Sequence, residues 1–496
     1  MDQTLLISER IPITVGVVGH LDVITTDEHR MQIEKLFKDL AARFPNSPIH
    51  LFSSIAEGAD RYVANIFLDI KRGNEEYQDR FELIVPIPFK AEEYKEDFDD
   101  ASDIEFDELL KQAKRSFTVG DERSGKDRPD QYLETGKLVA DSSLILIAMW
   151  DGKIGKKGGT ADIVNYKLTG DDDTVAESTF EYDGTIFILP SARAKSAETT
   201  LQSTPGKESL SLDLVLKEST LKEALEKIEE INRASLHVKS SDLDGSQSYM
   251  FIKQEKLNVP QQSLLCWYSI LDQLSLRSRK SDVVISVLMF VLGLSFIMTL
   301  EIYSNIWLNN IALLLTVSTL VIAAVLYLYS RLKQNHAKYL YSRTLAEALR
   351  IQFYWNIAGL QKNVSDYILR IHRKEFTWVK HVLSAIYGLS YNIKSIDPET
   401  INDLTDNWIK DQSGFFGSAI IKMNLRINRY RGMSNTSFFL ALILLVSIFF
   451  FRDFYETNNY MNLLLVLAPI LMGTFALIRA YIQMTGYKQL LNQYEL

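Results

Sequence analysis

The chain has 496 residues, of which 47% are hydrophobic, and this length is enough for two or three domains. Its 54 Lys and Arg residues are outnumbered by 63 Asp and Glu residues, and the net charge of -9 argues against nucleic acid as a partner. The single cysteine, Cys266, excludes an intramolecular disulfide framework and any metal site built from several cysteines.

Strands and helices alternate through the first 190 residues. Apolar or β-branched runs predict strands over 11–18, 49–53, 81–87, 143–150 and 185–189. Helical periodicity predicts helices over 27–44, after residue 60, over 91–114, over 132–140 and from Thr160 onward. This alternation predicts an α/β domain with a doubly wound parallel sheet, whose ligand site lies beyond the carboxyl ends of the strands.

Glycines and polar residues gather where these strands end. The run 143–150 is followed by a glycine loop and by Thr160 as a predicted helix N-cap. Such a loop favours a phosphate through close backbone approach and the helix dipole, although an ordinary strand-to-helix turn is the alternative. We expect one crevice to be lined by Gly16, Gly19, His20, Ser53, Ser54, Glu57, Gly58, Asp60, Trp150, Asp151, Gly152, Gly158, Gly159, Thr160 and Asp162.

A loop rich in Arg and Lys covers residues 120–130. Arg123, Lys126 and Arg128 could close over phosphates, although a solvated charged loop is the commoner meaning of such a run. His20 is expected to orient its loop and not to catalyse, because no second histidine or cysteine accompanies it in these motifs. The sequence has no P-loop, zinc-ligand spacing or Gly-x-Ser-x-Gly elbow, so we predict no catalytic residue and no metal site.

The second half of the chain is organised differently. Residues 191–250 are rich in Ser, Lys and Glu and are expected to form a charged insert or connector, with a helix over 221–231, and not a second globular core. Residues 251–496 are expected to form a helical membrane domain with spans at about 283–303, 306–330, 434–452 and 459–480. About 20 apolar residues suffice to cross a bilayer. The alternative, that these segments form buried helical hairpins of a soluble protein, is a poor explanation for four such segments.

Basic residues lie on one side of these spans. They cluster at 277–280, 331–333, 422–431 and 479–488, whereas the links 303–310 and 452–460 contain only Arg452. Both termini and the α/β domain are therefore expected in the cytoplasm, consistent with an N-terminus that has no signal-peptide core. Residues 331–395 are expected to continue the second span as a cytosolic helix that breaks near Gly359. Apolar segments with cytosolic helices are typical of homo-oligomers.

Three motifs, in order, resemble the SLOG superfamily of Rossmann-like domains over about residues 10–190. They are Gly16-Val17-Val18-Gly19-His20, the run Ser-Ser-Ile-Ala-Glu-Gly-Ala-Asp at 53–60, and Trp150-Asp151-Gly152 with Gly158-Gly159-Thr160-Ala161-Asp162. Separately, Ala346-Glu347-Ala348-Leu349-Arg350 after one hairpin, and Trp408 with Asp411-Gln412 ahead of the other, look like the SLATT class of membrane effectors.

The SLOG resemblance implies a nucleotide-derived ligand, such as an ADP-ribose relative or a cyclic nucleotide, and no other cofactor. A binding-only site would use the glycines for backbone approach, Thr160 for a phosphate, and Asp60 or Asp151 for ribose hydroxyls. Asp60 could instead only cap its own helix. SLOG domains joined to membrane helices are proposed bacterial anti-phage effectors, so the resemblance implies a second-messenger sensor that opens a pore in the cytoplasmic membrane.

The hydrolase branch of the same superfamily gives an alternative function, a membrane-anchored nucleotide N-glycosidase or phosphoribohydrolase. That branch uses a Pro-Gly-Gly-x-Gly-Thr-x-x-Glu element and a partner arginine. Here the matching stretch is Lys157-Gly158-Gly159-Thr160-Ala161-Asp162, which lacks the proline and the third glycine. Asp162 could replace the glutamate, and Arg123 or Arg128 could supply the cation. A membrane scaffold whose α/β domain has lost its ligand is a third possibility.

Overall fold

The computed structural model describes residues 9–98, 102–119, 127–153, 155–169, 185–194, 219–248, 257–367, 377–391 and 408–484. The chain divides into two compact units. The first comprises Met1–Leu274 and Tyr341–Ile401, and the second comprises Ser275–Leu340 and Asn402–Leu496. Residues between two of the predicted membrane spans therefore belong to the same unit as the α/β domain.

A six-stranded parallel sheet forms the centre of the first unit, in the order β4-β3-β2-β1-β5-β6. Its strands are β1 (Ile13–Gly19), β2 (Ile49–Phe52), β3 (Phe81–Ile87), β4 (Arg115–Thr118), β5 (Ile145–Trp150) and β6 (Thr185–Pro190). The strands β1, β2 and β5 are almost entirely buried, as expected for apolar strands covered on both faces. The predicted α/β doubly wound fold is confirmed.

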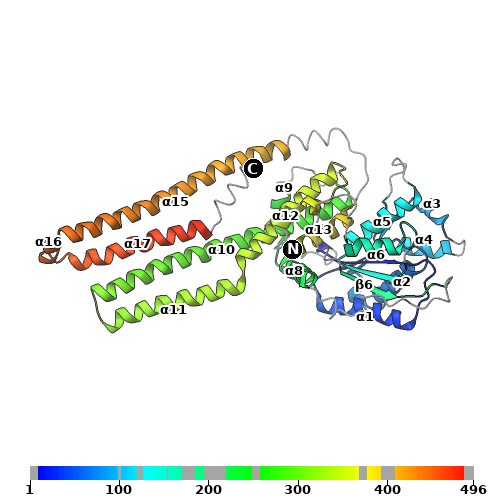
Figure 1. Cartoon of the computed structure of the whole chain (residues 1–496), viewed down its shortest axis with the longest axis horizontal. Coiled ribbons are helices and arrows are strands. Elements are labelled where there is room, and N and C mark those ends of the chain that lie inside the picture. The colour runs from blue at the N-terminus through cyan, green and yellow to red at the C-terminus, as the bar shows by residue number, and fades with distance from the viewer. Residues whose placement is uncertain are drawn as a thin grey trace. The chain divides into compact units, whose positions relative to one another are not determined.

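Helices cover both faces of this sheet. Those of the strand-helix alternation are α1 (Asp27–Arg43), α2 (Ala59–Arg72), α3 (Ala91–Lys95), α4 (Ser102–Gln112), α5 (Arg128–Ser142) and α6 (Thr160–Thr169), with a short 3-10 helix η2 (Glu75–Tyr77). Figure 1 shows α1 on one side of the sheet and α5 and α6 on the other. The Thr26 side chain caps α1 by accepting from the N–H of His29 at 3.2 Å. Because β5 lies on the opposite side of β1 from β2, the sheet has a switch point beside β1, which is where open parallel sheets of this kind bind their ligands.

The first unit extends beyond the domain boundary that we expected at residue 190. It includes α8 (Ser219–Ser235), α9 (Ser240–Ser248), the start of α10 (Val259–Asn305), most of α12 (Asn335–Ile357), η5 (Val364–Tyr367) and α13 (Thr377–Ser390). The side chain of Asn232 in α8 bonds both the N–H and the carbonyl oxygen of Ile11, at 3.0 and 2.8 Å. Leu221, Leu225 and Ile228 are buried in the same helix. The described part of the predicted connector thus contributes to the core.

The described part of the second unit consists of helices, all of them long except α16. They are the remainder of α10, α11 (Asn310–Lys333), α15 (Lys410–Phe450), α16 (Arg452–Thr457) and α17 (Met461–Met484). Four helices in the described parts of the chain are long and apolar enough to cross a membrane, as predicted. A Cβ added to Gly473 of α17 would lie 2.4 Å from Ile297 of α10, so a small residue permits close helix packing there. Gln334 adopts a left-handed conformation between α11 and α12, and α12 ends just before Gly359.

Candidate functional site

The sheet topology creates a switch point between β1 and β5. From β1 the chain winds outward through β2, β3 and β4 in one direction, and β5 and β6 lie on the other side of β1. In open parallel sheets of this kind, ligands bind beyond the carboxyl ends of the two strands at the switch point. Here those ends are Gly19 and Trp150. The residues that follow them, His20 and Asp151, therefore occupy the position where a ligand is expected.

His20 and Asp151 form a close polar pair at this switch point. The Nε2 atom of His20 lies 3.0 Å from Oδ1 of Asp151, and the two side chains are 11% and 9% exposed. The backbone N–H of Lys153 donates to the same Oδ1 at 3.1 Å. Burial raises the pKa of Asp151, but the hydrogen bonds from Lys153 and His20 outweigh burial and hold the pKa below its ordinary value. The Asp151 carboxylate therefore carries a negative charge at the switch point.

The β2–α2 loop contacts the β1–α1 loop through Gly58. The backbone N–H of Ala59 donates to the carbonyl oxygen of His20 at 3.1 Å. Gly58 has a φ of 79°, and an added Cβ would lie 2.2 Å from the carbonyl oxygen of Leu21. Both the left-handed conformation and the close approach require glycine. A Cβ on Gly19 would likewise lie 2.2 Å from the Cβ of Ala59. The structure thus brings the first two predicted motifs together.

Within the β2–α2 loop, the polar groups bind one another. The hydroxyl of Ser53 accepts from the N–H of Ile55 at 3.1 Å, and Asp60 accepts from the backbone N–H groups of Ala56 and Ser54. Asp60 is buried, and its pKa is raised to about 7 because burial outweighs those hydrogen bonds. The structure therefore favours the interpretation that Asp60 holds its own loop. Ser54 and Glu57 remain half-buried at the surface of this loop.

The glycine loop between β5 and α6 is also internally bonded. The N–H of Gly158 donates to Oδ2 of Asp162 at 2.8 Å, and the N–H of Gly159 donates to the carbonyl oxygen of Lys156 at 2.9 Å. Gly158 has a φ of 78°, and an added Cβ would lie 2.5 Å from the carbonyl oxygen of Pro129 in α5. These two amides are therefore occupied in this structure, and the loop packs on the first turn of α5.

The remaining predicted site residues are placed as follows. Gly16 lies inside β1, where a Cβ would approach Ser143 Oγ to 2.2 Å, so its role is in packing. Trp150 donates from Nε1 to the carbonyl oxygen of Lys153 at 2.9 Å and thereby fixes the turn through Gly152. Thr160 is the first residue of α6 and is buried.

Arg128 does not lie open for a phosphate. Its guanidinium pairs with Glu93 at 3.0 Å and Asp97 at 2.5 Å, and it stacks 4.2 Å from the ring centroid of Phe89. Arg123 and Lys126 lie outside the described residues. Of the three basic residues predicted to close over phosphates, only Arg128 lies among the described residues. The carboxylates of Glu93 and Asp97 balance its charge.

Arg61 is a functional-loop residue that the sequence motifs did not single out. Its guanidinium is buried, donates from Nε to the carbonyl oxygen of Ile55 at 2.9 Å, and donates to the carbonyl oxygen of Ser102 at 2.8 Å. It therefore holds Ile55, which has a positive φ of 47°. The only sequence signal was an arginine directly after Asp60, on the first turn of an otherwise apolar helix.

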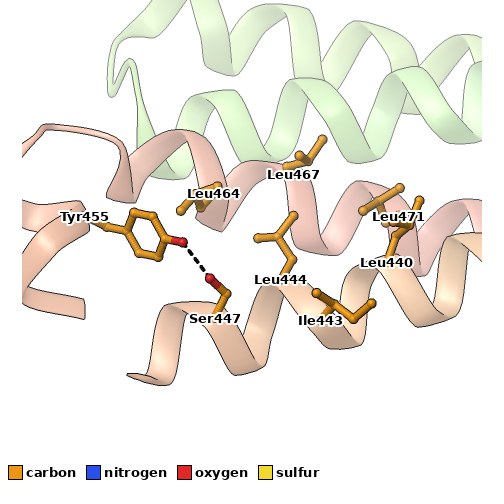
Figure 2. Close-up of a pocket in the computed structure, with 8 residues that line it drawn as sticks. All are labelled: Leu440, Ile443, Leu444, Ser447, Tyr455, Leu464, Leu467 and Leu471. Atoms are coloured by element: carbon orange, nitrogen blue, oxygen red, sulfur yellow. Dashed lines mark hydrogen bonds between the residues drawn. The ribbon is translucent and has the colours of Figure 1, made fainter. Parts of the chain in front are cut away.

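A hollow of about 370 Å³ lies in the second unit, between α15, α16 and α17. Figure 2 shows its wall, which consists of Leu440, Ile443, Leu444, Leu464, Leu467 and Leu471 with Ser447 and Tyr455 at one end. The hydroxyls of Ser447 and Tyr455 bond each other at 2.5 Å. This wall offers no charged group to a nucleotide, so the α/β switch point is the better candidate site.

Comparison with models of known protein families gave no match, and no curated protein matches the chain. The resemblance to SLOG and SLATT proteins therefore stays a prediction. The groups of three or more His, Cys, Asp or Glu residues that a metal ion needs do not occur among the described residues. The features of this chain that bear on function are the His20–Asp151 pair, the two loops around it and the chain connection from this unit to the four apolar helices.

Proposed function

We propose that this protein is a bacterial membrane effector in which the α/β unit senses a nucleotide-derived second messenger and gates a pore formed by the four-span unit. The ligand would bind beyond β1 and β5, at the His20–Asp151 pair. A role in anti-phage defence, a location in the cytoplasmic membrane and a homo-oligomeric assembly follow from the family resemblance and the charge pattern, and are part of the same proposal.

One observation carries this proposal: the chain between the second and third spans belongs to the α/β unit. After α11, the chain forms α12, whose residues Leu345, Leu349 and Phe353 are buried in this unit. It then forms α13 before entering α15, the third span. A rearrangement of the α/β unit can therefore act on the membrane helices through the backbone itself, without any additional contact.

Helix α5 supplies a route from the candidate site to α13. Its first turn supports the glycine loop through Pro129, as described above. Its last residue, Ser142, packs against Gly388 of α13. A Cβ added to Gly388 would lie 1.9 Å from Ser142 Oγ. Arg115 of the edge strand β4 holds the end of α13, because its guanidinium donates to the carbonyl oxygens of Leu389 and Tyr391. A ligand with different affinities for two positions of α5 would shift α13.

Ion flux from liposomes tests this function. The full-length protein is reconstituted with a trapped ion reporter, and ADP-ribose and cyclic nucleotides are added one at a time. We expect one of them to raise flux at least tenfold and to raise the melting temperature of the same protein. A nucleotide that raises the melting temperature while all of them leave flux unchanged would contradict gating. Protein-free liposomes and the exposed-site variant Asp69→Asn serve as controls.

The hydrolase alternative has less support. Asp162 would have to act on the ligand, but its carboxylate accepts the N–H of Gly158 at 2.8 Å. Arg128, a partner cation of that alternative, is paired with Glu93 and Asp97. A hydrolase would release product from the nucleotide in the binding assay, and Asp162→Asn would abolish that release.

A further inference from the structure

Exposed Lys and Arg residues gather at one end of the long helices of the second unit. They precede the apolar stretches of α10 and α15 and follow that of α11. We call six of them the basic collar: Lys280, Arg331, Lys333, Lys422, Arg429 and Arg431. All six are exposed, and they belong to a chain whose net charge is -9. Positive charge is therefore concentrated on this part of an acidic protein.

The helix ends that carry the collar lie on the same side of this unit. Both hairpin turns lie at its other end (Figure 1). A Cβ added to Gly473 of α17 would lie 2.4 Å from Ile297 of α10, so the two hairpins are packed together. Arg479, near the end of α17, donates to the side-chain oxygen of Asn435 in α15 at 2.8 Å. The basic collar is therefore one surface, to which α10, α11 and α15 contribute.

The charge of the collar is not balanced by carboxylates in the described parts of the chain. No ion pair between described residues involves any of the six side chains. Exposed basic residues of the first unit differ in this respect, because Arg30 pairs with Asp69 at 2.9 Å and Lys157 pairs with Asp130 at 2.6 Å. The collar thus offers a surplus of positive charge to a partner outside the chain.

The surroundings of the collar indicate what kind of anion it fits. Its residues flank helices that are apolar enough to cross a membrane, and such positions meet lipid headgroups. Leu332, which is 84% exposed, lies between two collar residues in sequence. Leu425, which is 66% exposed, shares a helix face with Lys422 and Arg429. A phospholipid offers phosphate oxygens to the cations and acyl chains to these leucines, whereas a free phosphate offers only the first.

We propose that the basic collar binds the headgroups of anionic phospholipids, such as phosphatidylglycerol. A headgroup with a net negative charge balances the collar, whereas a zwitterionic headgroup brings a cation of its own. This inference does not depend on nucleotide sensing. It assigns a class of lipid to a surface whose charges otherwise indicate only the orientation of the helices.

Lipid selectivity of the full-length protein in phosphatidylcholine bilayers tests the inference. The probes are spin-labelled phosphatidylglycerol and spin-labelled phosphatidylcholine with identical acyl chains. We expect the protein to associate with the phosphatidylglycerol probe at least about threefold more strongly. The preference should fall in about 1 M sodium chloride, where charges more than about 3 Å apart are screened. Equal association of the two probes at low salt would overturn the inference.

Inorganic phosphate separates the two sources of the same chemistry. It is added in excess over the lipid probe and compared with sodium chloride of equal ionic strength. We expect the two salts to reduce the preference for phosphatidylglycerol equally, because they only screen the charges. A preference that phosphate abolishes and sodium chloride leaves would assign the surface to free phosphate and overturn the lipid proposal.

Two variants with the same change in net charge locate the preference. The collar variant carries Arg331→Gln, Lys333→Gln, Arg429→Gln and Arg431→Gln. The control variant changes four exposed basic residues of the first unit: Arg30→Gln, Lys38→Gln, Arg72→Gln and Lys157→Gln. We expect the ratio of the two association constants to fall to about one in the collar variant and to stay as in wild type in the control. An equal loss in both variants would make the preference an effect of net charge and overturn the inference.

Exchange of arginine for lysine separates lipid binding from a structural need for arginine. Arg331→Lys, Arg429→Lys and Arg431→Lys together keep the charge, and lysine also binds phosphate. We expect this variant to keep at least half of the wild-type preference for phosphatidylglycerol. If it loses the preference as completely as the collar variant does, charge at the collar does not select the lipid and the inference is wrong.

Discussion

Asp60 shows how a single carboxyl group is used at the residue scale. It is buried in the β2–α2 loop, where its pKa is raised to about 7 from 3.8. Below pH 3.8, the folded and unfolded chains both carry the proton. Between pH 3.8 and about 7, the unfolded chain ionises while the folded chain keeps the proton, so the free energy of unfolding falls as pH rises. Above about pH 7, both chains are ionised at this position and the free energy of unfolding changes no further through Asp60.

The variant Asp60→Asn should remove this pH dependence. The amide oxygen can still accept a backbone N–H in the loop, but it cannot ionise. The shift corresponds to about 4 kcal/mol, at about 1.4 kcal/mol for each pKa unit. We therefore expect the variant to gain up to about 4 kcal/mol relative to wild type between pH 4 and pH 8. Thermal unfolding of the full-length protein in detergent at several pH values measures this gain.

The matched control for this experiment is Asp79→Asn, which alters an exposed carboxylate before β3. Its melting temperature should follow that of wild type at every pH. If the difference between Asp60→Asn and wild type does not change with pH, Asp60 is ionised in the folded protein and the account of its burial is wrong.

At the element scale, the docking of α13 on α5 depends on one small residue. A Cβ at Gly388 would lie 1.9 Å from Ser142 Oγ and 3.4 Å from Phe52. Gly388→Ala should therefore destabilise the first unit by about 1–3 kcal/mol through overpacking, even though alanine is the better helix former. Thermal unfolding checks this stability, and nucleotide-dependent flux checks the coupling, which should weaken in the same variant.

Two further variants make this result interpretable. Gly245→Ala is also a helical glycine substitution in the first unit, but its new Cβ would meet no heavy atom within 4 Å in the described chain. It should be neutral or slightly stabilising. Ser142→Gly should restore stability to Gly388→Ala in a double-variant cycle, because it removes the clashing side chain. Equal stability of Gly388→Ala and Gly245→Ala would show that α13 does not pack as described.

The elements that the sequence predicts well are those with strong local patterns. The five predicted strands are apolar runs, and all appear near their expected positions. β4 was not predicted because Arg-Ser-Phe-Thr is a short, half-exposed edge strand with no apolar run.

In the candidate site, contacts between loops decided the roles of residues that the motifs left open. Asp60 binds its own loop, and the amides of Gly158 and Gly159 are occupied by Asp162 and Lys156. Such pairings depend on backbone geometry and have no signature in residue order.

For the whole molecule, the main difference from the sequence-based organisation lies in which segments share a unit. Charge along 191–250 suggested a connector, yet Glu229 and Asn232 bind the segments before β1 and β2. Residues 341–391 follow a membrane span in sequence, yet their described part belongs with the α/β unit. Long-range packing of this kind is invisible to local periodicity. It also makes coupling through the backbone possible, since the α/β unit includes chain on both sides of the first hairpin.

The orientation in the membrane is a property of the whole molecule that the coupling model requires. If the α/β unit is cytoplasmic, the ends of both hairpins must face outside. The single native cysteine allows a clean test in a Cys266→Ser background. Ser304→Cys and Thr457→Cys place exposed thiols at the two hairpin ends, and Ser281→Cys places one before the first span. An impermeant thiol reagent added to intact spheroplasts should label the first two variants and label Ser281→Cys only after permeabilisation.

Labelling of Ser281→Cys from outside would place the His20–Asp151 pair away from cytoplasmic nucleotides. A nucleotide made in the cytoplasm could then not be the signal, whatever the α/β unit binds in detergent.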